Sequence, residues 1–287
     1  MSGRVLDGRE LASHLRRELR HRLDALRGAP DDGDVEATRS VRLAIVTDGR
    51  SEAANLYAAS LERAARSIGA TTEILVDPGS AGDEISRLNA DPLVAGIVVA
   101  QPFADPDAGR RLVEHIEPIK DVDGATPTSA GRLARGEPAM VPATALAVVA
   151  MLDAYGIPIA GKRAVVVGRS AVVGRPVASL LLARDATVVI CHRTTHNLAR
   201  ETRRAELLVV AAGVPGVIRS EMVNRSAVIV DCGINATEEG RIFGDVEYET
   251  VAPVVRAITP VPGGIGPVTP MMVLRQMVEA AERVAAV

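Results

Sequence analysis

Two periodicities of apolar residues organise the chain. Between Gly8 and Leu26, leucines recur every four residues and predict a helix with one apolar face. After residue 40, short apolar runs typical of buried strands alternate with helical patterns. The predicted strands of this half lie at 41–49, 71–76 and 94–102, and its predicted helices at 51–67, 83–91 and 105–116.

The same alternation resumes at Lys162 with a strand, a glycine turn, a helix and a second strand over 163–193. Because strands that alternate with helices form parallel sheets, we predict two α/β units, with binding sites at the carboxyl ends of their strands. Ala100 and Gln101 lie at one such strand end. Three further strands are predicted at 205–213, 226–233 and 256–264, a last helix at 271–287 and a polar loop at 28–40.

Charge and composition narrow the function classes. A formal net charge of -3 without a basic stripe argues against a nucleic-acid binder. No apolar stretch is long enough to cross a membrane and the N-terminus does not resemble a signal peptide, so we expect a cytoplasmic protein without a membrane partner. Cys191 and Cys232 show neither metal-ligand spacing nor a disulfide framework, and no metal site is expected. Lysine occurs only at Lys120 and Lys162, so arginine is the usual base of this chain.

The segment GRSAVVGRP, from Gly168 to Pro176, lies where a dinucleotide-binding fingerprint belongs, between an apolar strand and a helix. It departs from G-x-G-x-x-G, because Ser170 replaces the second glycine and Gly174 closes the turn one residue late. Gly168 allows a tight turn, and the N-terminus of the following helix offers N–H groups and a positive dipole end to phosphate. A simple tight turn is the alternative, and the strand-turn-helix context favours the phosphate site.

Basic residues stand at the corner where a dinucleotide presents its ribose. His192 and Arg193 end the second strand of this unit, where NAD-specific domains carry an acid, and Arg169 lies in the glycine turn. Cations at this corner suit a 2′-phosphate, so the sequence favours NADP over NAD. The alternative is that the two arginines are ordinary surface residues of an arginine-rich chain.

Four segments taken together, KDVDG, GRSAVVGRP, DCGIN and TPVPGGIGPVT, resemble the bifunctional methylenetetrahydrofolate dehydrogenase/cyclohydrolase family of the FolD type. The likeness extends from VLDGREL near the start to the last helix. It implies an α/β protein with a three-layer N-terminal catalytic domain, residues 1–147, completed by the C-terminal helix 271–287. A Rossmann-type NADP-binding domain with a parallel sheet, residues 148–270, is implied between them.

The resemblance also implies an activity and an assembly. Members of the family oxidise N5,N10-methylenetetrahydrofolate with NADP to the methenyl cation, and then hydrolyse that cation to 10-formyltetrahydrofolate. The folate cleft is implied to be bounded by both domains, and the homodimer to form through the Rossmann domains. The partners expected are thus a small-molecule tetrahydrofolate derivative and a second copy of the chain.

Site residues are carried over by position from the same resemblance. Tyr57 corresponds to the tyrosine that stacks along the folate, and Asp123, the second acid of KDVDG, to the carboxylate that hydrogen-bonds the pterin. Without the family, Asp123 would be interpreted as a turn acid before Gly124. The loop implied to lie between pterin and nicotinamide is Pro262, Gly263 and Gly264, and the residues implied to bind the cofactor are Gly168, Arg169, Ser170, Val173, Gly174, His192, Arg193, Gly213, Ile234 and Thr269.

Two positions depart from the family pattern. The motif Ser-x-x-Tyr-x-x-x-Lys ends here at Leu61, and the glutamine of V-Q-L-P falls on Ala100, counted back without a gap from Asp123. Gln101 is adjacent, but on a strand a shift of one residue points a side chain to the opposite face. A misplaced register or simple decay is the alternative explanation, although an exchange of Lys for Arg would have left arginine at 61.

The absence of the lysine and the glutamine would affect the two reactions of the family differently. Hydride transfer requires positioning of two carbons, whereas hydrolysis requires a group that moves protons. The first hypothesis is therefore an NADP-dependent dehydrogenase whose cyclohydrolase step is lost or weak. The second is an oxidoreductase or cyclase-type enzyme acting on another cyclic imine or iminium in specialised biosynthesis, and the third is a non-catalytic protein that binds folate or NADP.

Overall fold

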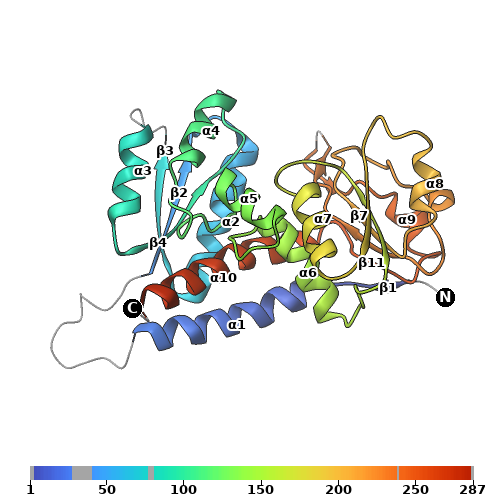
Figure 1. Cartoon of the computed structure of the whole chain (residues 1–287), viewed down its shortest axis with the longest axis horizontal. Helices are drawn as coiled ribbons and strands as arrows, with labels where there is room; N and C mark the ends of the chain where they lie inside the picture. Colours follow the sequence, from blue (N-terminus) through green and yellow to red (C-terminus); the bar gives the residue numbers. More distant parts are fainter. Residues whose placement is uncertain (1–2, 28–40, 77–80, 238, 286–287) are drawn as a thin grey trace. The chain divides into compact units, whose positions relative to one another are not determined.

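The computed structural model describes residues 3–27, 41–76, 81–237 and 239–285 (Figure 1). Contacts within the chain divide it into two compact units, each built on a parallel sheet. The three-strand unit comprises Ser13–Ala143 and Pro270–Val287, and the six-strand unit comprises Met1–Ala12 and Thr144–Thr269. The predicted polar loop at 28–40 lies outside the described residues. The α/β class predicted from the alternation of strands and helices is confirmed.

The three-strand unit holds a parallel sheet in the order β3-β2-β4. Helices α3 and α4 pack on β4, and α2 packs on β2 and β3 (Figure 1). This unit contains β2 (Arg42–Thr47), α2 (Glu52–Ile68), β3 (Thr71–Val76), α3 (Ala81–Ala90), β4 (Val94–Val99), α4 (Pro106–Glu114), α5 (Pro127–Ala134) and most of α1 (Gly8–Arg27) and α10 (Ile265–Ala285).

Both faces of β2 are buried, as is usual for a central parallel strand. Ala44 and Val46 point to one face and join the core cluster that α3 and α4 complete with Ile85, Leu88 and Leu112. Successive strand residues point to opposite faces, so the residues between them line the other side. The small side chains of α2 allow close packing, and its buried residues are Ala54, Ala58, Leu61, Ala64, Ala65 and Ile68.

Local signals fix the ends of α2. Ser51 caps its N-terminus by accepting a hydrogen bond from the N–H of Ala54, and Gly69 ends it in the left-handed conformation at φ 86°. These two caps set the phase of the helix, and therefore the direction of Tyr57 and Leu61.

Helix α10 begins at Ile265, earlier than the predicted start at Met271. Pro267 lies in its first turn, where a missing N–H costs nothing because that group has no partner within a helix. The buried amide of Gln276 then donates to the carbonyl oxygens of Val122 (2.7 Å) and Val141 (2.9 Å) and accepts from the N–H of Val141 (2.8 Å). The last helix thereby fastens the segment that precedes Asp123.

The six-strand unit carries a parallel sheet in the order β1-β11-β8-β7-β5-β6. A short antiparallel pair, β9 with β10, stands apart from it. The elements are β1 (Arg4–Val5), α6 (Ala143–Ala154), β5 (Arg163–Val167), α7 (Gly174–Ala183), β6 (Thr187–Cys191), α8 (Leu198–Thr202), β7 (Leu207–Val210), a 3₁₀ turn (Ser220–Met222), β8 (Val228–Asp231), β9 (Asn235–Ala236), β10 (Ile242–Phe243), α9 (Tyr248–Val251) and β11 (Ala257–Ile258).

The start of the chain belongs to the six-strand unit, whereas the sequence analysis assigned residues 1–147 to the catalytic domain. The reason is that β1 pairs in parallel with β11. The hydroxyl of Tyr155 also accepts from the N–H of Asp7 (2.8 Å) and donates to its carbonyl oxygen (3.1 Å). A two-residue strand carries no periodicity, so this pairing has no signal in the sequence. No helix among the described residues is long and apolar enough to cross a membrane.

Candidate active site

Tyr57 and Asp123 meet in the three-strand unit. Tyr57 lies on α2, and Asp123 follows the Lys120–Val122 segment, whose first carbonyl accepts from the N–H of Ile97 on β4 (2.8 Å). The Tyr57 hydroxyl donates to Oδ1 of Asp123 at 3.3 Å, and both side chains are partly buried. The structure thus brings together the two residues predicted to hold the substrate.

The Asp123 carboxyl group has an unusual affinity for its proton. Burial, and secondly the charge of Asp121, raise the pKa of Asp123 to about 7, against the hydrogen bonds from Tyr57 and from the N–H of Ala143. Burial and the neighbouring Asp123 likewise raise the pKa of Tyr57 well above its usual range. This pair therefore offers a carboxyl that changes charge near neutrality and a phenol that stays protonated.

Asp121 and Lys120 hold the segment that carries Asp123. The fully buried carboxylate of Asp121 accepts from the N–H groups of Ala125 (2.8 Å) and Thr126 (2.9 Å) and from the Ser129 hydroxyl (2.6 Å). Gly124 has φ +60°, and an added Cβ would collide with the main chain of Val141. Asp121 is therefore an anchor of the turn.

The Lys120 ammonium group caps the C-terminus of helix α3. Its Nζ donates to the carbonyl oxygens of Leu88 (3.0 Å) and Asn89 (2.6 Å) in the last turn of α3 and of Asp91 (2.8 Å) just beyond it. Carbonyls at a helix C-terminus have no partner within the helix and need an outside donor. Three donors spread from one atom suit this site, whereas the flat fork of an arginine does not. This geometry explains why a chain with so few lysines has one here.

The positions implied for a lysine and a glutamine are both closed to solvent. Leu61 lies one turn after Tyr57 on α2 and has 0% of its surface exposed, and Ala100 at the end of β4 is equally buried. The N–H of Ala100 donates to the carbonyl of Val46 (2.8 Å) and so continues the sheet, while the next side chain, Gln101, is exposed. Gln101 thus points away from the face that Ala100 occupies.

Glycines shape the turn between β5 and α7. Gly168 has φ +127°, and a Cβ there would overlap the carbonyl of Ala211, while a Cβ on Gly174 would overlap the carbonyl of Gly168. The Ser170 Oγ accepts hydrogen bonds from the N–H groups of Val173 (3.1 Å) and Gly174 (3.4 Å) at the start of α7. The tight cradle beneath the N-terminus of a ten-residue helix fits the phosphates of a dinucleotide.

The other predicted cofactor residues lie around this turn or further along the same unit. Arg169 and Arg193 are exposed, and neither forms an ion pair within the described part of the chain. His192 follows β6, and its Nδ1 lies 2.9 Å from the Thr194 hydroxyl. Gly213 follows β7 with φ +64°, Ile234 is exposed after β8, and the Thr269 hydroxyl donates within α10 to Ile265 (3.3 Å).

The Pro262–Gly264 loop joins β11 to α10 in the six-strand unit. Gly263 has φ +113°, and an added Cβ would lie 2.9 Å from the guanidinium carbon of Arg9. Its carbonyl accepts from the N–H of Gly8 (2.8 Å), and the N–H of Gly264 donates to Pro260 (2.8 Å). The start of the chain therefore supports this predicted substrate loop, which the sequence analysis did not anticipate.

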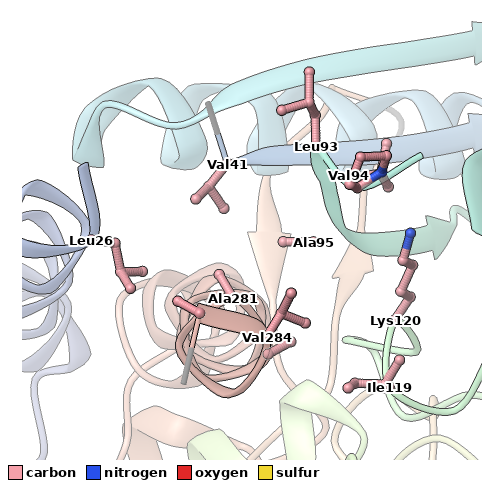
Figure 2. A pocket seen from close by; sticks show the side chains of 12 residues that line it. Leu26, Val41, Leu93, Val94, Ala95, Ile119, Lys120, Ala281 and Val284 are labelled. Atoms are coloured by element: carbon pink, nitrogen blue, oxygen red, sulfur yellow. The ribbon is translucent and has the colours of Figure 1, made fainter. Parts of the chain in front are cut away.

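An apolar cavity of ≈ 510 Å³ lies elsewhere in the three-strand unit (Figure 2). Leu93, Val94, Ile119 and Val284 are among its lining residues, at the amino end of β4 and the last turns of α10. The predicted site is at the opposite, carboxyl end of β4, so this cavity does not belong to it. Within the described residues, no group of His, Cys, Asp and Glu is arranged to hold a metal ion.

Sequence profiles of one family match nearly the whole chain. The profile described as "Tetrahydrofolate dehydrogenase/cyclohydrolase, catalytic domain" matches residues 6–123, and its "NAD(P)-binding domain" counterpart matches residues 142–285. Among curated proteins, the chain is 44% identical to the bifunctional protein FolD of Parafrankia sp., over 97% of this chain and 99% of that one. It is 43% identical to that of Acidiphilium cryptum, over 98% and 99% of the two chains.

Solved structures agree with these matches. The bifunctional FolD dehydrogenase/cyclohydrolase of Campylobacter jejuni superposes with a TM-score of 0.90 at 36% identity, covering 98% of this chain and 99% of that one. The Trypanosoma brucei enzyme, solved with NADP cofactor and inhibitor, superposes with a TM-score of 0.92 at 31% identity and covers 100% of both chains.

Proposed function

The chain belongs to the tetrahydrofolate dehydrogenase/cyclohydrolase family, and we propose that it is an NADP-dependent methylenetetrahydrofolate dehydrogenase whose cyclohydrolase step is lost or weak. The observation that carries the proposal is that Leu61, one turn after Tyr57 on α2, and Ala100, at the end of β4, are both apolar and fully buried. The proposal therefore separates two reactions that the FolD relatives combine in one protein.

Dehydrogenation makes small demands on the side chains. Bound NADP would accept a hydride from the methylene bridge of the folate. The cation left on the bridge carbon is shared with its two flanking nitrogens, so the substrate provides its own stabilisation. The protein must hold the pterin, a task that we assign to Tyr57 and Asp123. No side chain has to remove a proton in this step.

Hydrolysis of the methenyl cation makes larger demands. Water has to lose a proton as it attacks the bridge carbon, and a ring nitrogen has to gain one before the ring opens. A positioned acid-base group typically accelerates such a step by about 10²–10⁴-fold. Leu61 and Ala100 transfer no proton, and Gln101 is directed away. The hydrolytic step is therefore expected to be slow here.

The preference for NADP rests on the corner beside the glycine turn. Arg169 and Arg193 are exposed cations with no ion-pair partner among the described residues, and His192 directly precedes Arg193 after β6. A 2′-phosphate would neutralise these charges. The glycine cradle at Gly168 and Gly174 would receive the pyrophosphate.

Gly168→Ala should abolish measurable NADP binding. The new Cβ would overlap the carbonyl of Ala211 and would also oppose the φ of +127°, so the turn would have to move out of its cradle. Fluorescence titration with NADPH measures the affinity. Gly131→Ala, at a helical glycine with open space around it in the other unit, is the matched control and should bind as the wild type does. Equal affinities in both variants would contradict the assigned turn.

The proposal is tested by giving the purified chain methylenetetrahydrofolate and NADP and following NADPH and the methenyl product separately, beside the Parafrankia relative. Methenyl product that accumulates with NADPH here, but is consumed by the relative, supports a dehydrogenase without its hydrolytic step. Equal consumption by both proteins contradicts the proposal. NADPH formation from another cyclic imine only would favour the altered-substrate hypothesis, and NADP binding without any turnover would favour a non-catalytic binder.

We further propose a homodimer formed through the six-strand unit. Strand β6 is the edge of its sheet, where Ile190 is 42% exposed, and Leu182 on the neighbouring α7 is 65% exposed. An exposed edge strand with apolar residues is a ready surface for pairing. Light scattering should give twice the chain mass, and Ile190→Lys with Leu182→Glu should reduce it to one chain mass. A wild type that is monomeric at micromolar concentration would rule this assembly out.

A further inference from the structure

A buried aspartate from a distant segment holds the turn that follows β7. Asp245, just after β10, is completely buried, and its Oδ2 accepts from the N–H groups of Ala212 (2.7 Å) and Gly213 (2.8 Å). Its Oδ1 accepts from the side-chain amide of Asn235 at 2.9 Å. One carboxylate therefore ties together the segments that follow β7 and β8.

A second buried aspartate fixes the main chain of the first. Asp231, at the end of β8, accepts from the N–H groups of Gly233 (2.8 Å) and Asp245 (3.1 Å) with Oδ1, and from Val246 (2.9 Å) with Oδ2. Side chains at Gly233 or Gly244 would overlap these carboxylates, so the two glycines make the network possible. The position of Asp245 is thus determined from both its backbone and its side chain.

The turn held by Asp245 lies beside the glycine cradle. Strand β5 lies between β7 and β6, so the chain that moves from β5 to β6 returns past β5 to reach β7 and thereby reverses its direction along the sheet. Dinucleotides bind in the crevice outside the carboxyl ends of parallel strands at such a reversal. The carbonyl of Ala211 lies directly against Gly168, and Ala212 and Gly213 follow it.

We propose that Asp245 is a positioning residue for NADP, which holds the Ala212–Gly213 turn in the place that the cofactor requires without touching the cofactor itself. This inference rests on the proposed function. A carboxylate is suited to the task because it offers acceptors only, and three N–H donors converge on it. An asparagine at 245 could still accept the N–H groups of Ala212 and Gly213 with its amide oxygen. Its N–H₂ group would then face the N–H₂ group of Asn235, and two donors cannot bond to each other.

The test measures the NADP dissociation constant of the full chain by calorimetry. Asp245→Asn should raise it about tenfold, the effect of one lost charge-assisted hydrogen bond, while kcat at saturating NADP stays within about twofold. The double variant Asp245→Asn/Asn235→Asp exchanges donor and acceptor across this bond at unchanged net charge. It also removes the hydrogen bond that the Asn235 amide donates to the carbonyl of Gly244 (3.1 Å), so it should recover part of the affinity. Asp153→Asn removes an exposed carboxylate paired with Arg184 in the same unit and should change nothing.

A second variant tests the inference even if Asp245→Asn does not fold. Asn235→Ala removes one donor from Asp245 at a partly exposed position and leaves the carboxylate in place, and it should weaken NADP binding about threefold. A dissociation constant equal to the wild type's in folded Asp245→Asn, with or without a lower melting temperature, would overturn the inference. If Asp245→Asn does not fold, an unchanged constant in Asn235→Ala overturns it. A wild type that binds no NADP would overturn the proposed function itself.

Discussion

Leu61→Lys combined with Ala100→Gln should raise methenyltetrahydrofolate hydrolysis by this chain about 10²–10⁴-fold, the usual contribution of a positioned acid-base group. Both new side chains would start from fully buried positions, one of them a turn away from Tyr57 on α2. Burial lowers the pKa of a lysine, which allows it to accept a proton near neutral pH. The measurement is the decay of methenyl absorbance without NADP, corrected for the spontaneous reaction.

The matched control is Leu61→Met with Ala100→Gln, which keeps residue 61 apolar at a similar volume. It should leave hydrolysis at the wild-type level, because glutamine alone supplies no base. Thermal melting of both variants is needed, since replacing buried apolar side chains is expected to cost stability. A folded lysine-containing variant with unchanged hydrolysis would contradict the role that we assign to residue 61.

Asp123→Asn should lower kcat/KM for methylenetetrahydrofolate about 10–100-fold, because the pterin would lose a charge-assisted hydrogen bond. NADP affinity should not change, because the carboxylate belongs to the three-strand unit and the glycine cradle to the other. Asp91→Asn, an acid of the same unit that is paired with Arg42, is the control and should retain wild-type kinetics. Wild-type kcat/KM in Asp123→Asn would remove this residue from the site.

The same variant predicts two pH effects. In the wild type, kcat/KM should fall about tenfold per pH unit below pH 7, as Asp123 with its pKa of about 7 takes up a proton, and Asp123→Asn should lose this dependence. The folded-state pKa lies above the reference value of 3.8, so folding favours the protonated form and stability is lost as pH rises between these values. Asp123→Asn should therefore melt higher than the wild type at pH 8, with the difference vanishing toward pH 4.

Local chemistry was sufficient for part of the site. The apolar runs that became β2, β4 and β5 were long enough to be recognised, and the glycines of the β5–α7 turn were placed by their strand-turn-helix context. The family resemblance assigned both Tyr57 and Asp123 to the substrate, although 66 residues separate them in the chain, and the hydrogen bond between them was not predicted. Each of these features depends on residues close together in sequence or on a recognisable motif.

Long-range contacts supplied what the sequence left open. Lys120 showed no role in sequence beyond its motif, because its three acceptors lie about thirty residues earlier at the end of α3. The Phe-Gly-Asp-Val stretch predicts no role for Asp245, because its hydrogen-bond partners belong to segments that follow two other strands. The structure starts α10 before both Pro267 and Pro270, although prolines normally argue against a helix. The first turn tolerates Pro267, whereas Pro270 lies inside the helix.

The sequence by itself determined the α/β class and the strand-turn-helix context of the glycine turn, and it led to the prediction that Leu61 and Ala100 stand where the family pattern has lysine and glutamine. Only the tertiary structure decided that both of those positions are closed to solvent, that β1 joins the six-strand sheet and that Asp245 holds a turn of the cofactor unit. The physical reason is range. Periodicity and turn chemistry act between near neighbours in the chain, whereas burial and the pairing of polar groups depend on segments that meet only after folding.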